Sequence, residues 1–227
     1  MSMAFALKSD GTDDEEFLFE RIAGDLHAQG WSVVPNALPI HISFAIFSQL
    51  QTSTDDAFAP AGVGRSVDHV IDPSIRRDEI SWIEGITQAE RDWLQWSDRL
   101  RIYLNRRLFL GLFSFESHFA HYRPGAFYRK HVDAFRNQPF KDGTNRVLSV
   151  VAYFNPDWLP EHGGELVMYD ESGVHSIQSV APEFGTLVVF LSEDVPHEVK
   201  PARRDRFSIA GWYRVNNSIN QQIDPPR

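Results

Sequence analysis

Two histidines and an aspartate have the types and spacing that could bind a catalytic metal ion. His131 and Asp133 lie two residues apart, and residues i and i+2 of an extended strand project from the same face. Their imidazole and carboxylate could therefore chelate one ion. If the fold brings His197 alongside, two imidazoles and one carboxylate form the ligand set suited to a non-haem Fe(II) that keeps open positions for chemistry.

An arginine close to His197 adds a second chemical feature. Arg206 begins an alternating segment, and we expect it to share the inner face of a strand with Ser208. A charge on that face is costly unless it is paired, so Arg206 needs an anionic partner. Its planar guanidinium suits a carboxylate, and the hydroxyls of Ser208 or Tyr153 could complete the hydrogen bonds to that anion. This pattern fits a dicarboxylic 2-oxo acid as co-substrate.

The composition limits the class of protein. A chain of 227 residues with 42% hydrophobic content can bury one substantial core. We expect one domain over 1–227, with mostly helical support in 1–110 and a strand-rich core in 111–216. The net charge of -9 argues against a nucleic-acid partner and favours a basic or neutral target surface. Oligomeric state cannot be read from these numbers.

The absence of cysteine and of long apolar runs argues against disulfide-bonded proteins, thiolate sites and membrane-spanning proteins. The chain has no cysteine, so it has neither disulfides nor a thiolate site, which suits a reducing compartment. The start lacks the apolar core of a signal peptide, and no segment is apolar over a membrane-spanning length. We therefore expect a cytoplasmic protein with no membrane partner.

The periodicity of apolar residues changes along the chain. Helical spacing predicts helices near 17–30, 40–50 and 87–108, the last with a capping box at Thr87 and Glu90. Afterwards the period is two, which predicts eight strands: 113–122, 128–133, 146–154, 165–169, 174–180, 186–191, 195–200 and 206–215. Helices followed by eight strands favour a mainly β fold with flanking α-helices. This fold is a double-stranded β-helix, or jelly roll, with the N-terminal helices packed on one sheet.

The first of these strands indicates where a cavity would lie. Phe115 and Phe119 share one face, which we expect to meet the helices, while His118, Ala120 and Tyr122 share the other and could line a cavity between the sheets. His118 and His121 could support metal ligands from there. Packed core or surface histidines are the commoner alternative, and a lone HxD pair is common by chance.

Residues 75–213 carry a set of motifs that resemble a known family. The stretches are IRRDEISWIEG at 75–85, HYRPGAFYRKHVDAF at 121–135, AYFNPDW at 152–158, HGGELVMY at 162–169, VPHEVKPA at 195–202 and RFSIAGWYR at 206–214. They are similar to the hypoxia-factor prolyl hydroxylases and their bacterial relatives, within the 2-oxoglutarate- and Fe(II)-dependent dioxygenases. GWSVVPNALP at 30–39 is also similar, so the resemblance covers most of the chain.

The resemblance implies roles for individual residues. His131, Asp133 and His197 match the iron triad, and Arg206 matches the arginine that binds the distal carboxylate of 2-oxoglutarate. Tyr153 matches a tyrosine that hydrogen-bonds the same carboxylate, and Tyr122 matches one that lies beside the iron and the co-substrate. Trp212 matches an aromatic residue that lines the pocket for the target residue. The positions of Arg76, Asp78 and Trp82 match a segment that in the family closes over the protein substrate. Asp78 is expected to pair with Arg146. The loop from Ala134 to Asn145 departs from the animal enzymes by its greater length.

The reaction implied by the resemblance is the hydroxylation of a prolyl residue in a protein. In it 2-oxoglutarate and O2 become succinate and CO2, with Fe(II) as the metal and ascorbate as a stimulant. Two alternatives remain open: hydroxylation of a free amino acid or other small molecule, and a sensor that binds metal and 2-oxoglutarate without turnover. Asp133 argues against halogenation, and the Arg206-Phe207-Ser208 segment lacks the Arg-x-Asn-x-x-x-Arg ending of nucleic-acid demethylases.

Overall fold

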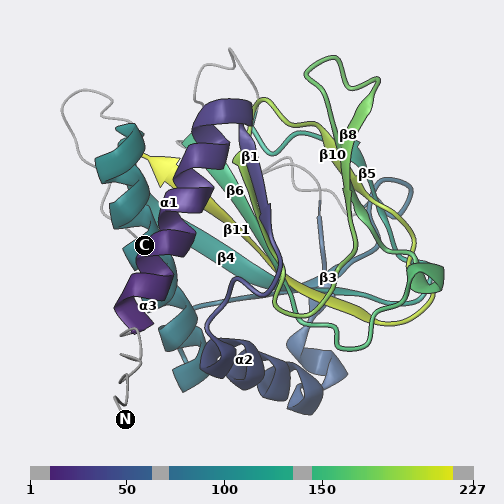
Figure 1. Ribbon diagram of the computed structural model, residues 1–227. Coiled ribbons are helices and arrows are strands. Elements are labelled where there is room, and N and C mark those ends of the chain that lie inside the picture. The colour runs from purple at the N-terminus through teal and green to yellow at the C-terminus, as the bar shows by residue number, and fades with distance from the viewer. Residues whose placement is uncertain (1–10, 63–71, 135–144, 217–227) are drawn as a thin grey trace, which may run out of the picture.

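The protein folds into two antiparallel sheets with helices against one of them. The structure is a computed structural model that describes residues 11–62, 72–134 and 145–216. Its helices are α1 (Gly11–Gln29), α2 (Ile40–Thr52) and α3 (Gln88–Leu108), with short 3-10 turns η1 (Asp55–Ala57) and η3 (Pro160–His162). In Figure 1 the helices lie to the left of and below the larger sheet, and β5, β8 and β10 lie on its other side.

The larger sheet has the strand order β1-β9-β6-β11-β4-β3-β2. Its strands are β1 (Trp31–Val34), β2 (Ala59–Pro60), β3 (Glu79–Trp82), β4 (Leu112–Tyr122), β6 (Asn145–Tyr153), β9 (Leu187–Leu191) and β11 (Arg206–Val215). The smaller sheet has the order β5-β10-β7-β8, with β5 (Tyr128–His131), β7 (Leu166–Tyr169), β8 (Ser176–Val180) and β10 (His197–Val199). All eight predicted strands are present, and the mainly β architecture with helices on one sheet is confirmed.

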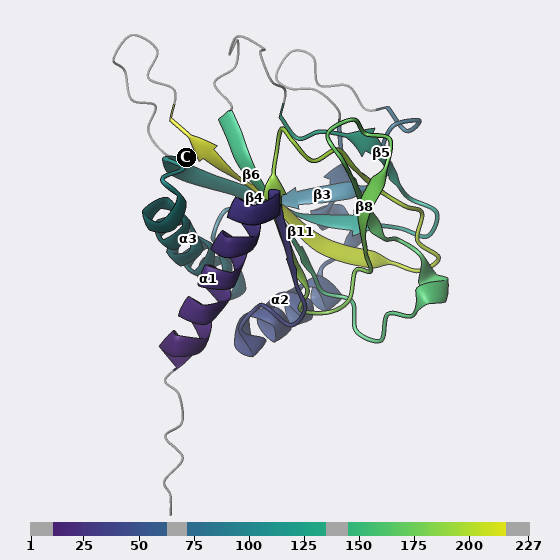
Figure 2. The ribbon, with the colours of Figure 1, turned by 45° about the horizontal axis from the view of Figure 1, so that its top comes forward.

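Two apolar clusters lie on the two faces of the larger sheet. The outer face packs against the helices around Trp93 and Trp96, both fully buried, and it includes Phe119 of β4. The inner face contributes Ala120, Tyr122 and Tyr153 to a cluster shared with the smaller sheet. The predicted division of β4 into a helix-facing and a cavity-facing side is therefore confirmed. Figure 2 shows α1 and α3 together on one side of the larger sheet, opposite β5 and β8.

Residues 75–82 join both sheets at one edge. Arg76 forms an antiparallel bridge with Tyr128 at β5 of the smaller sheet, and three residues later β3 begins to pair with β4 of the larger sheet, with Trp82 opposite His118. The short β2 adds to the outer side of β3. This segment is thus shared between the two sheets. None of the helices in the described ranges has the length and apolar character needed to cross a bilayer.

Helix α3 is capped at both ends by local chemistry. The Thr87 hydroxyl accepts a hydrogen bond from the Glu90 N–H at 3.1 Å, and the Glu90 carboxylate accepts one from the Ile86 N–H at 2.9 Å. At the other end Phe109 adopts a left-handed conformation with φ 57°, although its ring is 88% exposed. Glycine is the usual residue for that conformation, because a Cβ atom crowds the backbone there.

Phe109→Gly is expected to stabilise the protein by about 0.5–1 kcal/mol. The left-handed conformation costs an L-residue roughly 1–2 kcal/mol, and the greater chain entropy of glycine offsets part of that gain. Urea denaturation would measure the change. Phe109→Ala is the matched control, because it also removes the exposed ring but keeps Cβ. An equal gain from alanine would assign the effect to the ring and not to the backbone.

Candidate active site

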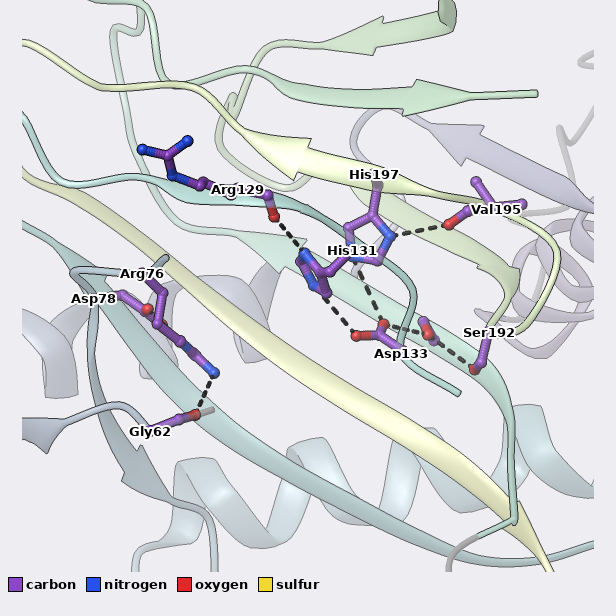
Figure 3. A network of polar contacts seen from close by, with 10 residues as sticks. Gly62, Arg76, Asp78, Arg129, His131, Asp133, Ser192, Val195 and His197 are labelled. Atoms are coloured by element: carbon purple, nitrogen blue, oxygen red, sulfur yellow. Dashed lines mark hydrogen bonds and ion pairs between the residues drawn. The ribbon is translucent and has the colours of Figure 1, made fainter. Parts of the chain in front are cut away.

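The three predicted metal ligands lie together between the sheets. The pairing of β10 with β5 places His197 directly opposite His131, and their ring centroids are 4.3 Å apart. Asp133 follows β5, with its carboxylate oxygens 3.5 Å from His131 Nε2 and 3.8 Å from His197 Nε2. The three potential ligand atoms lie within 4.8 Å of one another. Figure 3 shows both rings turned toward the carboxylate.

Main-chain carbonyls hold both imidazoles in one orientation. His131 Nδ1 lies 2.8 Å from the Arg129 carbonyl, and His197 Nδ1 lies 3.0 Å from the Val195 carbonyl. Because a carbonyl only accepts, Nδ1 of each ring carries a hydrogen, and Nε2 is the nitrogen that faces the Asp133 carboxylate. Metal-binding histidines show this same arrangement, with one nitrogen hydrogen-bonded and the other facing the ion. Burial, followed by the neighbouring His131, lowers the pKa of His197 to about 4.

A serine pair positions the carboxylate of Asp133. The Ser149 hydroxyl on β6 donates to Asp133 Oδ2 at 2.6 Å and lies 2.9 Å from the Ser192 hydroxyl, so the contact chain in Figure 3 runs across to the larger sheet. Burial favours the neutral acid. The adjacent His197 and His131 outweigh it and hold the pKa of Asp133 well below its usual range. The carboxylate is therefore ionised, as a metal ligand must be.

Arg206 is a buried cation without an acidic partner among the described residues. It is 1% exposed; its Nε donates to the Gly164 carbonyl at 2.9 Å and its Nη1 to the Ser208 hydroxyl at 3.2 Å. The rings of Tyr122 and Tyr153 lie 4.8 and 5.0 Å from its guanidinium carbon. A buried charge satisfied only by neutral groups is unfavourable. This arrangement therefore suits a carboxylate ligand.

The two tyrosines beside Arg206 are neutral hydrogen-bonding groups. Burial raises the pKa of Tyr153 to about 12 and the pKa of Tyr122 well above its usual value. The Tyr153 hydroxyl is buried and has no hydrogen-bond partner of normal geometry in the described part of the chain. This hydroxyl lies next to a guanidinium that has no acidic partner among the described residues, and together they fit an anion with two oxygens.

The structure contradicts the expected pairing of Asp78 with Arg146. Asp78 instead pairs with Arg76, at 2.7 Å from Nε to Oδ1 and 2.5 Å from Nη2 to Oδ2. The two residues are two apart in an extended segment, so they share a face. Arg146 instead donates to Glu116 at 2.8 and 3.0 Å and stacks 3.6 Å above the Trp212 ring, because Glu116 lies opposite Trp212 in the β4–β11 register.

The residues predicted to contact a target line the same inner face beyond the triad. The His118 ring lies 5.3 Å from the Trp82 ring and 5.4 Å from the Trp212 ring, measured between centroids. Trp82 is 51% exposed, whereas Trp212 is buried. Arg76 stacks on Tyr128, and Tyr128 stacks on His131 at 3.6 Å. Aromatic and charged side chains therefore extend from the triad to the surface.

Comparison with known proteins places the chain in a family. Residues 117–214 match the family model of the 2OG-Fe(II) oxygenase superfamily. A prolyl-4-hydroxylase crystal structure from Pseudomonas putida is 40% identical, with a TM-score of 0.76, and the match covers 87% of this chain and 99% of that one. The chain belongs to the prolyl hydroxylase branch of the 2OG-Fe(II) oxygenase superfamily. The two sheets are thus the double-stranded β-helix of this family, which uses Fe(II), 2-oxoglutarate and O2.

Three further relatives share a smaller part of their sequence with this chain. A Trichoplax adhaerens prolyl hydroxylase, solved with a fragment of a hypoxia-inducible factor, is 28% identical with a TM-score of 0.77, over 92% of this oxygenase and 94% of that chain. Human prolyl hydroxylase EGLN3 is 29% identical over 88% of this chain and 85% of its own length. The Caenorhabditis elegans hypoxia-inducible factor prolyl hydroxylase is 28% identical, and this chain spans only 28% of its length.

Sequence reasoning did not assign some of the groups that shape the site of this oxygenase. Ser149 lies four residues before Tyr153 in β6, but its bond to Asp133 depends on the approach of the two sheets. Tyr128 lies three residues before His131 and could have been found as the aromatic of the same short strand. The long Ala134–Asn145 loop lies, apart from its two ends, outside the described residues.

Removing His118 is expected to reduce the loss of stability of this oxygenase in acid. Burial lowers the pKa of His118 to about 4, with smaller effects of Asp78, Arg76 and Arg146. Between the unfolded pKa, roughly 6.5, and the folded value, only the unfolded state binds the proton, so stability falls as pH falls. The His118 contribution to this loss from pH 7 to pH 5 is about 2 kcal/mol.

Urea denaturation at pH 7 and at pH 5 would measure the contribution of His118 to the free energy of unfolding. In the metal-free protein, the stability difference between wild type and His118→Gln should shrink by that amount at pH 5. His41→Gln, at an exposed position, is the control and should leave the pH dependence unchanged. An identical pH dependence in His118→Gln and wild type would show that His118 is protonated in the folded state.

Proposed function

We propose that this oxygenase hydroxylates a prolyl residue in a cytoplasmic protein. The observation that carries the proposal is the combination, between two sheets, of an oriented His-Asp-His triad with a buried arginine that lacks an acidic partner among the described residues. The sequence identity of 40% to a bacterial prolyl-4-hydroxylase supports the choice of proline. The lack of cysteine supports a reducing compartment.

In this proposal the triad residues hold the metal. His131 Nε2, His197 Nε2 and an oxygen of Asp133 would bind Fe(II), and the Arg129 and Val195 carbonyls would keep both rings in the required tautomer. Ser149 would keep the carboxylate turned toward the ion. When bound, Fe(II) supplies the redox chemistry in which 2-oxoglutarate and O2 are consumed and the target gains one oxygen atom.

The anion site would orient the co-substrate. Arg206, Ser208 and Tyr153 would bind the distal carboxylate of 2-oxoglutarate, which supplies the missing charge and the missing hydrogen-bond partner for the Tyr153 hydroxyl. Tyr122, neutral and buried, would contact the co-substrate nearer the metal. The rigid strands that carry these groups leave little freedom in how the co-substrate lies.

The remaining predicted residues would receive the target protein. Trp82 and Trp212 offer aromatic surfaces that suit the apolar ring of proline. The Arg76–Asp78 pair would fix the segment that carries Trp82, and Arg146, held by Glu116, would hold the Trp212 ring by stacking. The Trichoplax relative was solved with a peptide of a protein target, which supports a protein substrate here.

Purified protein supplied with Fe(II) and ascorbate is expected to convert 2-oxoglutarate to succinate. His131→Ala should lower this rate at least 100-fold, because it removes a metal ligand, and should also weaken Fe(II) binding. Succinate assay and metal titration would measure the two effects. His175→Ala, at an exposed turn, is the control. Tight Fe(II) and 2-oxoglutarate binding without any succinate from wild type would instead indicate a sensor.

A comparison of proteomes tests the target. Cells that carry the wild-type gene should contain a prolyl residue with one added oxygen atom, and cells that lack the gene or carry His131→Ala should not. Peptide mass spectrometry would locate the residue. If succinate forms in the assay but only a free metabolite gains oxygen in the cells, the enzyme hydroxylates a small molecule and the protein substrate is refuted.

A further inference from the structure

Two exposed arginines lie on the outward side of the strands next to the triad. The Arg77 N–H donates to the Phe127 carbonyl and the Arg129 N–H donates to the Ile75 carbonyl, both at 2.9 Å. Arg76 stacks on Tyr128, and Tyr128 stacks on His131, whereas Arg77 and Arg129 contact Phe127, the residue before Tyr128, on the opposite, outward side. The register shift in the β10–β5 pairing places Tyr128 and His131 on one face although they are three residues apart, so strict alternation does not continue from Arg129 to His131. In Figure 3 the Arg129 side chain points away from His131 while its carbonyl points toward that ring.

Both guanidinium groups are held in place by the protein. Arg77 Nε donates to the Pro73 carbonyl at 2.8 Å, and Arg129 Nε donates to the adjacent Ser74 carbonyl. Their central carbons lie 5.1 and 5.9 Å from the centroid of the same Phe127 ring. The terminal Nη atoms of both have no partner within the described ranges. Each arginine therefore presents fixed donors to solvent, which suits a bidentate carboxylate.

The charge around this pair is positive. Asp72 accepts hydrogen bonds from Ser74 and interacts electrostatically with Arg129. Asp78 is engaged by Arg76, so among the described residues that contact this pair two outward cations share the one carboxylate of Asp72. Because salt screens charges beyond about 8–10 Å, this local excess acts on a bound segment even though the chain carries -9 overall. The basic or neutral target expected from net charge does not apply here.

We propose that Arg77, Phe127 and Arg129 form a docking surface for an acidic segment of the protein substrate. This inference rests on the proposed function, since it assumes a protein target. Arg129 precedes His131 by two residues, or roughly 7 Å along the strand. An extended substrate with its target residue at the triad would place an Asp or Glu about two to four residues away on this surface, with an apolar neighbour against Phe127.

The test is a charge-reversal exchange on a peptide centred on the residue that the proteome comparison locates. The double variant Arg77→Glu/Arg129→Glu should raise KM for that peptide about tenfold, in line with two partly exposed ion pairs, and should change kcat less than twofold. A peptide with the flanking acidic residues replaced by Lys should recover the low KM with the variant and lose it with wild type. Arg106→Glu, an exposed arginine on α3, is the matched control.

The outcomes separate this inference from the proposed function. Recovery with the Lys peptide supports the docking surface and also shows that the variant is folded and active. A mapped target without Asp or Glu within about four residues, or an unchanged KM in the double variant, overturns the docking surface alone. If no protein gains oxygen, the protein substrate is refuted, and the docking surface with it.

Discussion

The register of two short strands determines whether this molecule has a metal site. β10 contributes three residues and β5 four, yet their pairing places His197 opposite His131. A slip of one residue would turn each histidine to the other face of the smaller sheet. The register is held by β7 on the other side of β10 and by the apolar residues between the sheets. The large helix-backed sheet thus supports the smaller sheet and keeps His131 and His197 opposite each other.

The site contains charges that the protein alone leaves unbalanced. Asp133 is buried with its pKa held well below the usual range, and Arg206 is buried with neutral hydrogen-bond partners. Both arrangements reduce the stability of the protein without ligands. A metal cation would compensate the first and a dicarboxylate the second, so ligand binding and folding should be coupled. The helix-backed core, with Trp93 and Trp96 fully buried, contributes stability that offsets the cost of burying the charges of Asp133 and Arg206.

The sequence predicted the parts of the site that follow from local periodicity. Arg206 and Ser208 lie two residues apart in β11, and Asp133 lies two residues after His131, just beyond the end of β5, so the proximity within each pair could be deduced without knowing the fold. Contacts between distant strands could not. The Ser149–Asp133 bond joins the two sheets, and the Arg146–Glu116 pair depends on the neighbours of Trp212. The Asp78–Arg146 prediction failed although the correct partner, Arg76, lay two residues away on the same face. A local pair should have been preferred over a distant one.

The segment 75–82 is hydrogen-bonded to both sheets at the edge beside the triad. The two layers therefore cannot separate at that edge unless these backbone bonds break together. The same segment carries Arg77 on its outer side and Trp82 at its end. Substitutions that adapt this stretch to a new target would also change how readily the layers part and release a bound ion. Under the proposed function, target selectivity and metal retention would therefore depend on the same backbone hydrogen bonds.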